Sequence, residues 1–144
     1  AILPTNRWTH IAVTMSETHI CTYINGVKVN ETAKNTWVNI SNFYLGFSYS
    51  NGREFTGYMA EMRLWNKALT ADEINAPNHF YEVDPNSEGL FSYWKFVEGK
   101  GSTVADATGK GNLLYGETDI TKQSNGDNCG PEGIEWVEVA LPDK

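Results

Sequence analysis

The chain has 144 residues, of which 40% are hydrophobic and 12% aromatic, with 13 glycines and 5 prolines. This length accommodates one domain with a sizeable core, and the composition excludes a disordered chain. The net charge of -7 and the scattered Lys and Arg exclude a nucleic-acid partner, because an acidic surface repels phosphate backbones. Apolar runs are only a few residues long, so no transmembrane segment is predicted.

Strand signals dominate the chain. They are runs of β-branched and aromatic residues bounded by Gly, Asn and Asp, and the clearest of them alternate between two faces. Strands are predicted over residues 8–15, 19–24, 27–30, 43–50, 57–66, 89–96 and 134–141. Asn25-Gly26 lies between the second and third of these runs and predicts a tight hairpin, because both residues tolerate the positive φ of a type I′ turn.

One short helix is predicted near 71–76. Thr70 is its N-cap and Glu73 follows three residues later, which is a capping box. Pro77 ends the helix after barely two turns. A single connector helix in a chain rich in strands indicates an all-β architecture.

Residues 97–133 are rich in turn formers. Asp106-Ala107-Thr108-Gly109 is the clearest turn among them. Its Asp suits the capping of backbone amides, and its Gly suits a left-handed conformation.

Four quoted stretches carry a family resemblance. "RWTHIAVT", "TYINGVKV", "FYLG" and "FTGYMAEMRLWNKALTADEI" follow one another over residues 7–74. In order and spacing they resemble the second half of a laminin-G-like, concanavalin A-like jelly roll. The resemblance implies an antiparallel jelly-roll β-sandwich of the concanavalin A-like lectin/glucanase type.

The later stretch "GLFSYWKFVEGKGSTVADATGKGN" also resembles this family, in an arrangement similar to surface modules of the Bacteroidetes. This implies an extracellular or outer-membrane location. We expect residues 1–144 to form a single domain that lacks the N-terminal strands of the jelly roll. The alternative is a second module beginning near Glu88, for which about 56 residues are too few to complete a sandwich.

Glucanases of the related fold carry Glu-x-Asp-x-x-Glu or Glu-x-Asp-x-Glu on a strand. Here Glu82 and Asp84 match, but the second Glu is replaced by Asn86 or Ser87. Pro85 also interrupts any strand that would align the two carboxyl groups of a retaining mechanism. We therefore expect no enzymatic activity, and we interpret His10 as a packing residue of the strand pattern.

The resemblance to lectin-like domains implies recognition of a glycan as the function. Sugars bind to exposed aromatic faces framed by polar side chains. Trp37 follows a polar stretch and is the predicted stacking platform; the alternative is an anchor that packs a loop. Tyr49, Asn51 and Arg53, with the neighbouring Glu54, form a second candidate cluster, unless they are an ordinary solvated hairpin tip.

The predicted ligand is a polysaccharide or glycoconjugate, with other surface proteins as further partners. The alternatives are an adhesion module that binds protein and a structural spacer. The resemblance also implies a structural Ca²⁺, because members of the family hold one through Asp and backbone carbonyl oxygens. Asp106 with Asn112 is the first candidate pair and Asp127 with Asn128 the second. For Asp106 a turn-capping carboxylate is the alternative.

Overall fold

The computed structural model describes residues 3–34, 45–46, 55–115 and 136–141. Within these residues the regular elements are short strands and one helix joined by turns and coil, and every strand pair is antiparallel. The strands are β1 (Ile11–Met15), β2 (His19–Ile24), β3 (Val27–Ala33), β4 (Met62–Trp65), β5 (Leu90–Trp94), β6 (Thr103–Val104) and β7 (Leu114–Tyr115), and the helix is α1 (Ala71–Ile74). The predicted all-β class is confirmed.

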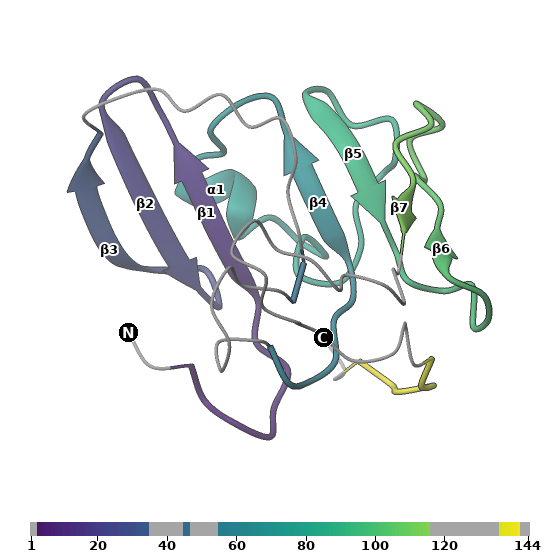
Figure 1. Cartoon of the computed structure of the whole chain (residues 1–144). Helices are drawn as coiled ribbons and strands as arrows, with labels where there is room; N and C mark the ends of the chain where they lie inside the picture. Colours follow the sequence, from purple (N-terminus) through teal and green to yellow (C-terminus); the bar gives the residue numbers. More distant parts are fainter. Residues whose placement is uncertain (1–2, 35–44, 47–54, 116–135, 142–144) are drawn as a thin grey trace, which may run out of the picture.

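The strands form three small sheets, with the orders β1-β2-β3, β4-β5 and β6-β7. Figure 1 shows the three-stranded sheet on one side of the molecule and β6 with β7 on the other. The β4-β5 pair lies between them, and α1 lies behind β1 and β4. The helix therefore connects the sheet built by the first part of the chain to the strand pair in the middle.

Five predicted strands are confirmed as β1 to β5; β2 has the predicted ends, and the other four have changed ends. The largest change is in β4, which begins at Met62 instead of residue 57. Glu61 has φ 58, and this left-handed conformation cannot belong to an extended strand. Of the strand predicted over 43–50 only residues 45 and 46 are described, in a bend.

The strand predicted over 134–141 is wrong for residues 136–141. These residues are in coil and do not pair with any described strand. The indole of Trp136 instead donates a hydrogen bond to the backbone oxygen of Gly101, at 2.7 Å.

The Asn25-Gly26 hairpin is confirmed. Asn25 has φ 47 and Gly26 has φ 76, as a type I′ turn requires. The turn is also bound to the residue before β1. The backbone N–H of Asn25 donates to the carbonyl of His10, and the N–H of His10 donates to the Asn25 side-chain oxygen, both at 2.9 Å.

The capping box of α1 is confirmed. The Thr70 hydroxyl accepts from the Glu73 N–H at 3.2 Å, and the Glu73 carboxylate accepts from the Thr70 N–H at 2.8 Å. The helix ends at Ile74, earlier than the predicted residue 76. Asn75 ends it, because its side-chain amide donates to the Ala71 carbonyl at 2.8 Å and its backbone leaves the helical conformation.

One group of buried side chains lies where α1 packs against the three-stranded sheet; we call this contact the junction. Ile74 is completely buried and packs with Tyr23 of β2 and with Leu69. Ala12, Cys21, Trp65 and Phe80 surround this cluster. A second buried group centres on β5, where every residue except Phe91 is buried. The first buried group joins β2 to α1, and the second is formed by β5. Trp65 of β4 packs against the first group, and β4 pairs with β5, so the two groups are linked through this strand pair.

The other side of the three-stranded sheet is apolar and open. On β1 the exposed fractions are 49% for Ile11, 63% for Val13 and 37% for Met15. Side chains that are paired across antiparallel strands share a face. We define the apolar face as these three residues with Ile20, Thr22 and Ile24 of β2 and Val27, Asn30 and Thr32 of β3. It contains no charged residue, which is the character of the inner face of a two-sheet sandwich.

We predict that Gly26→Ala destabilises the chain by about 2–4 kcal/mol. A Cβ at this position would overlap the Asn75 side-chain oxygen and lie 3.0 Å from Phe80, at a φ that favours glycine. Gly99→Ala is the matched control, because Gly99 has φ +66 but nothing within 4 Å. It should cost only the conformational strain, about 1 kcal/mol. Urea unfolding followed by tryptophan fluorescence measures both, and equal losses in the two variants would contradict the prediction.

Candidate functional site

The residues predicted to bind sugar lie outside the described part of the chain. Trp37 falls within residues 35–44, and Tyr49, Asn51 and Arg53 fall within residues 47–54. The same is true of the second calcium pair, Asp127 with Asn128. The stacking platform and its polar frame therefore stay predictions.

Asp106 lies at the start of the predicted turn, and its carboxylate is surrounded by donors. Its Oδ1 accepts from the Tyr93 N–H at 3.1 Å and from the N–H and hydroxyl of Thr108 at 3.0 and 2.7 Å. Its Oδ2 accepts from the side-chain amide of Asn112 at 3.3 Å. Burial raises the pKa of Asp106, but these hydrogen bonds outweigh it and hold the pKa below its usual value. The carboxylate is thus an ionised cap for the turn.

The same contacts bear on the predicted calcium site. A Ca²⁺ ion would need oxygen ligands, whereas Asn112 turns its amide nitrogen toward Asp106 and Ser92. Nor do the described residues contain a group of three or more His, Cys, Asp or Glu that could hold a metal. The arrangement fits the turn-capping alternative, and calcium at Asp106 and Asn112 stays a prediction.

The glucanase-like acidic residues lie in turns and coil, within residues 81–89. Glu82 forms an ion pair with Lys95 at 2.6 Å. The Asp84 carboxylate accepts from the Asn86 N–H at 2.8 Å and serves to close a turn. Neither carboxylate lies on a strand that would align it with a partner across a glycosidic bond.

A buried ion pair that the sequence analysis missed lies where β4 meets β5. Arg63 and Glu61 are joined at 2.5 Å, with side-chain exposures of only 5% and 14%. The Tyr93 hydroxyl donates to the same Glu61 oxygen. Arg63 also donates to the His79 carbonyl at 2.5 Å, and its guanidinium lies 5.0 Å from the centre of the Tyr93 ring. We call Glu61, Arg63 and Tyr93 the buried triad.

The contacts of the buried triad indicate a structural role, in which Glu61 and Arg63 before and within β4 are held against Tyr93 of β5. Burial raises the pKa of Tyr93 most, and its hydrogen bond to Glu61 raises the pKa further. The phenol therefore stays protonated and acts as the donor. Glu61 is held by two donors at a backbone conformation that non-glycine residues rarely adopt. Both donors bond the same carboxylate oxygen, Oε2, and this contact gives Glu61 a structural role.

A local signal for the triad was present in the sequence. Glu61 and Arg63 are two residues apart, a spacing that would place both side chains on one side of the strand predicted over 57–66, although Glu61 itself has the left-handed φ of 58. Tyr93 is the residue paired with Arg63 in the β4-β5 register. That register could not be read from the sequence, because 24 residues of helix, turn and coil, 66–89, separate β4 from β5.

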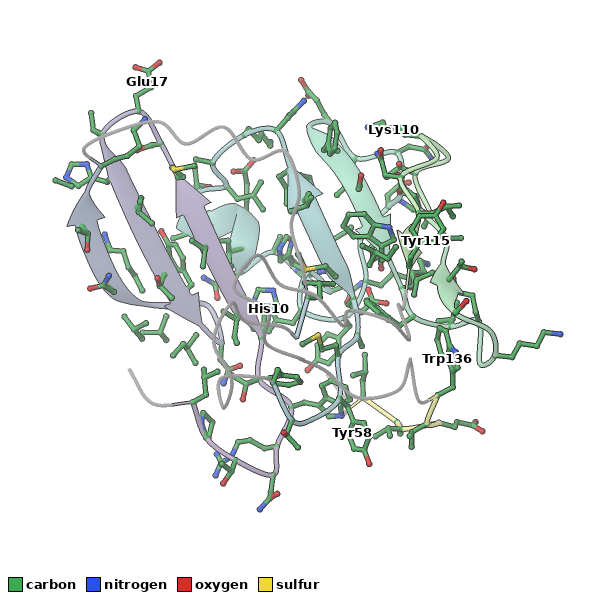
Figure 2. All side chains as sticks on the ribbon, viewed as in Figure 1. His10, Glu17, Tyr58, Lys110, Tyr115 and Trp136 are labelled. Atoms are coloured by element: carbon green, nitrogen blue, oxygen red, sulfur yellow. The ribbon has the colours of Figure 1, made fainter. Side chains whose placement is uncertain are left out.

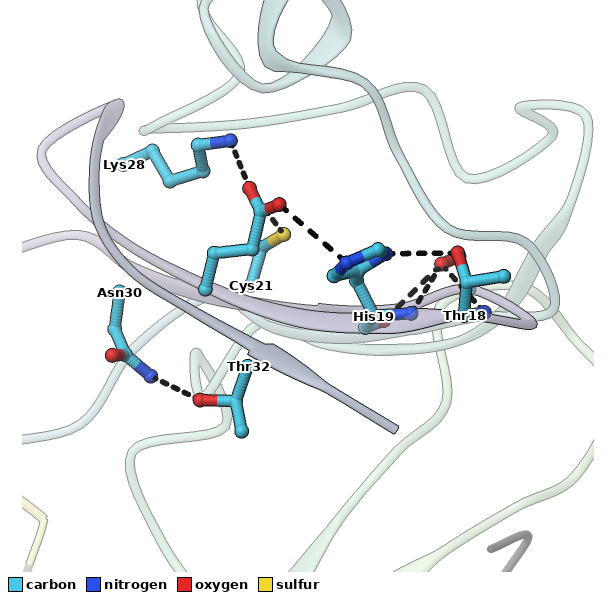
Figure 3. A network of polar contacts seen from close by, with 8 residues as sticks. Thr18, His19, Cys21, Lys28, Asn30 and Thr32 are labelled. Atoms are coloured by element: carbon cyan, nitrogen blue, oxygen red, sulfur yellow. Dashed lines mark hydrogen bonds and ion pairs between the residues drawn. The ribbon is translucent and has the colours of Figure 1, made fainter. Parts of the chain in front are cut away.

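A second polar network lies on β2 and β3 (Figure 3). Lys28 forms an ion pair with Glu31, and the other oxygen of Glu31 lies 3.8 Å from the His19 ring nitrogen. The Cys21 thiol lies 3.8 Å from the Glu31 carboxylate. The hydrogen bond from Lys28 is the main cause that lowers the pKa of Glu31. Since the side chains of His19, Lys28 and Glu31 are each more than 40% exposed, this is a solvated surface network.

Aromatic side chains also lie on the described surface. Tyr58 is 59% exposed and Tyr115 is 67% exposed. In Figure 2 both project outward, Tyr58 near the lower end of the molecule and Tyr115 beside β7. Neither was selected from the sequence, because an exposed Tyr has no pattern that distinguishes it from a packed one.

Comparison with known families identifies the class of the chain. A family model described as the concanavalin A-like lectin/glucanases superfamily matches residues 1–75, which is just over half of the sequence. The chain belongs to this superfamily. The predicted resemblance and the predicted fold class are thereby confirmed.

One solved structure resembles the chain along most of its length. It is that of a proposed carbohydrate binding protein from Bacteroides ovatus ATCC 8483, with 31% sequence identity and a TM-score of 0.58. The match covers 78% of this chain but 35% of the other, so the chain spans about a third of that protein. No curated protein matches the chain.

We predict that Asp106→Ala lowers the free energy of unfolding by about 2 kcal/mol, because four hydrogen bonds to an ionised cap are lost. The loss should be the same with added calcium and with a chelator. Thermal unfolding by circular dichroism under both conditions measures it. A melting temperature of the wild-type chain that rises with calcium, and does not rise in Asp106→Ala, would contradict this prediction and support the calcium site at Asp106.

We further predict that Glu61→Gln destabilises the chain by about 3 kcal/mol, because it leaves the Arg63 guanidinium buried without its counter-charge. Glu31→Gln is the matched control. It removes a carboxylate from a solvated pair and should change stability little. Urea unfolding of both variants decides the matter, and a Glu61→Gln variant as stable as Glu31→Gln would show that the triad does not have the structural role we describe.

Proposed function

We propose that the chain is a non-catalytic carbohydrate-binding module of a cell-surface protein that captures glycans. The observation that carries the proposal is membership of a superfamily of lectins and glucanases, together with the similarity to a proposed carbohydrate binding protein. Fold alone does not assign function, so the remaining support comes from the residues.

The acidic residues support a module without catalysis. Retaining glycosidases need two carboxyl groups about 5–5.5 Å apart on either side of the scissile bond. Glu82 pairs with Lys95, Asp84 closes a turn, and Glu61 is held by Arg63 and Tyr93. Each of these described carboxylates has a structural partner that would have to be removed before it could act as an acid or a nucleophile.

We assign the sugar contact to Trp37, with Tyr49, Asn51 and Arg53 as its polar frame. An indole ring offers an apolar face for the C–H surface of a pyranose, and amide and guanidinium groups suit the hydroxyls around the ring. The ligand class is a polysaccharide or glycoconjugate. Among the described residues no helix has the length and apolar character needed to cross a membrane, and the surface location is part of the proposal.

A second candidate function is contact with another polypeptide, as in an adhesion or spacer module. The apolar face favours it, because an exposed sheet face without a charged residue is typical of protein contacts. Such a face lacks the aromatic rings that sugar binding needs, so the two functions would use different surfaces.

We predict that Trp37→Ala weakens glycan binding by about tenfold, the loss expected when one stacking ring is removed. A glycan array first identifies the ligand, and affinity gel electrophoresis with that polysaccharide then measures the change. Tyr115→Ala is the control, since it removes an exposed ring outside the assigned site. Circular dichroism confirms that both variants fold.

Absence of binding to every glycan on the array would reject the carbohydrate function. Binding that survives Trp37→Ala but is lost in Tyr115→Ala would keep the function and reject the assigned site. Retention of a neighbouring surface protein by the wild-type chain, with loss in Val13→Asp, would instead support the second candidate.

A further inference from the structure

Four aromatic rings from three segments meet at the junction of the three-stranded sheet with β4. His10 precedes β1, Trp65 ends β4, and His79 and Phe80 follow α1. The His10 ring stacks on Phe80 with centroids 4.4 Å apart and meets His79 edge-on at 5.7 Å. His79 in turn stacks on Trp65 at 6.1 Å. Figure 2 shows His10 near the start of β1, close to the middle of the molecule. We call these four rings the ring stack.

The ring stack holds the two parts of the junction together directly. The backbone of His10 is bonded to the Asn25 turn on both its N–H and its carbonyl. The turn is in turn bonded to the end of α1, through the Asn75 amide and the Gly26 carbonyl at 3.1 Å. The ring of His10 thus contacts Phe80 and His79 after the helix, while its backbone is bonded to the hairpin turn.

The surroundings of the two imidazoles suit only their neutral forms. His79 is 8% exposed, and Nδ1 of His10 is buried with no hydrogen-bond partner among the described residues. A fixed positive charge, the Arg63 guanidinium of β4, donates to the His79 carbonyl at 2.5 Å. From α1 the facing carboxylate is Glu73, but it is engaged by Lys67 at 2.7 Å and by Thr70.

We propose that the ring stack is an acid-sensitive clasp, in which protonation of His10 and His79 weakens the junction between the three-stranded sheet and the α1–β4 layer. A proton on either imidazole places a positive charge beside the other ring and near Arg63. The carboxylates that could compensate are already paired, Glu61 with Arg63 and Glu73 with Lys67. The cation must then either leave the stack or remain buried without a partner.

The titration of the two residues supports this reading. Burial lowers the pKa of His10 from 6.5 to about 4, and the neighbouring His79 and Arg63 act in the same direction. Burial and then Arg63 lower the pKa of His79, against a weaker opposing effect of Glu73. Because the unfolded chain binds these protons more readily, stability is complete above pH 6.5 and is lost as the pH falls toward 4.

The test is urea unfolding of the full chain at about pH 7 and about pH 5, a range above the ordinary titration of carboxylates. We expect the folding equilibrium constant to fall by about 20-fold over this range, from the His10 shift alone. His10→Phe keeps an aromatic ring against Phe80 but cannot be protonated, so it should lose most of this acid sensitivity. His19→Phe is the matched control, because His19 lies in the solvated surface network and its removal should leave the acid sensitivity unchanged.

Two further measurements locate the effect. Hydrogen exchange, corrected for the intrinsic rate, should increase at acid pH first in residues 19–25 and 71–75. NMR titration of the wild-type chain should show the His10 imidazole still neutral at about pH 5.5 while the chain is folded. The proposal is overturned if His10 is half protonated near pH 6.5 in the folded chain, or if His10→Phe and wild type lose stability equally.

Discussion

The hydrogen-bonded contact between the Asn25-Gly26 turn and Asn75 at the end of α1 determines how the first part of the chain meets the rest. Gly26 is required there because its backbone approaches Asn75 and Phe80 more closely than a side chain allows. This contact brings Tyr23 of β2 onto Ile74 of the helix, where both are buried. The hairpin, the short helix and the start of β4 are therefore one packing unit, although 49 residues separate Gly26 from Asn75.

An ion pair and several hydrogen bonds stabilise this unit where β4 pairs with β5. The buried triad fixes Glu61 and Arg63 against Tyr93. Asp106, the first residue of the turn that it caps, accepts a hydrogen bond from the Tyr93 N–H. Burial of charged groups is costly unless they are paired, and each of these carboxylates has its donors. These groups fix β5, the centre of the second buried group, beside β4, and they leave the described carboxylates in structural roles. The proposed recognition function is consistent with this use of the acidic residues.

Local chemistry could be predicted from the sequence, and non-local pairing could not. Thr70 with Glu73 and Asn25 with Gly26 define their structures within four residues, and both were predicted correctly. The Glu61–Arg63 pair was visible as a local pattern, but its Tyr93 partner depends on the β4-β5 register. The predicted strand at 134–141 failed over 136–141, because alternation alone does not supply a neighbouring strand. The His10–His79 contact joins residues 69 positions apart, and nothing near either residue indicates it.

The apolar face of the three-stranded sheet carries no charged side chain. The net charge of -7 is distributed over the rest of the chain, and none of it lies on this face. Electrostatic repulsion between copies therefore depends on their orientation, since two molecules that approach through this face meet without opposing charges. The tendency of the chain to self-associate should therefore depend more on whether the apolar face is covered than on the net charge of the whole chain.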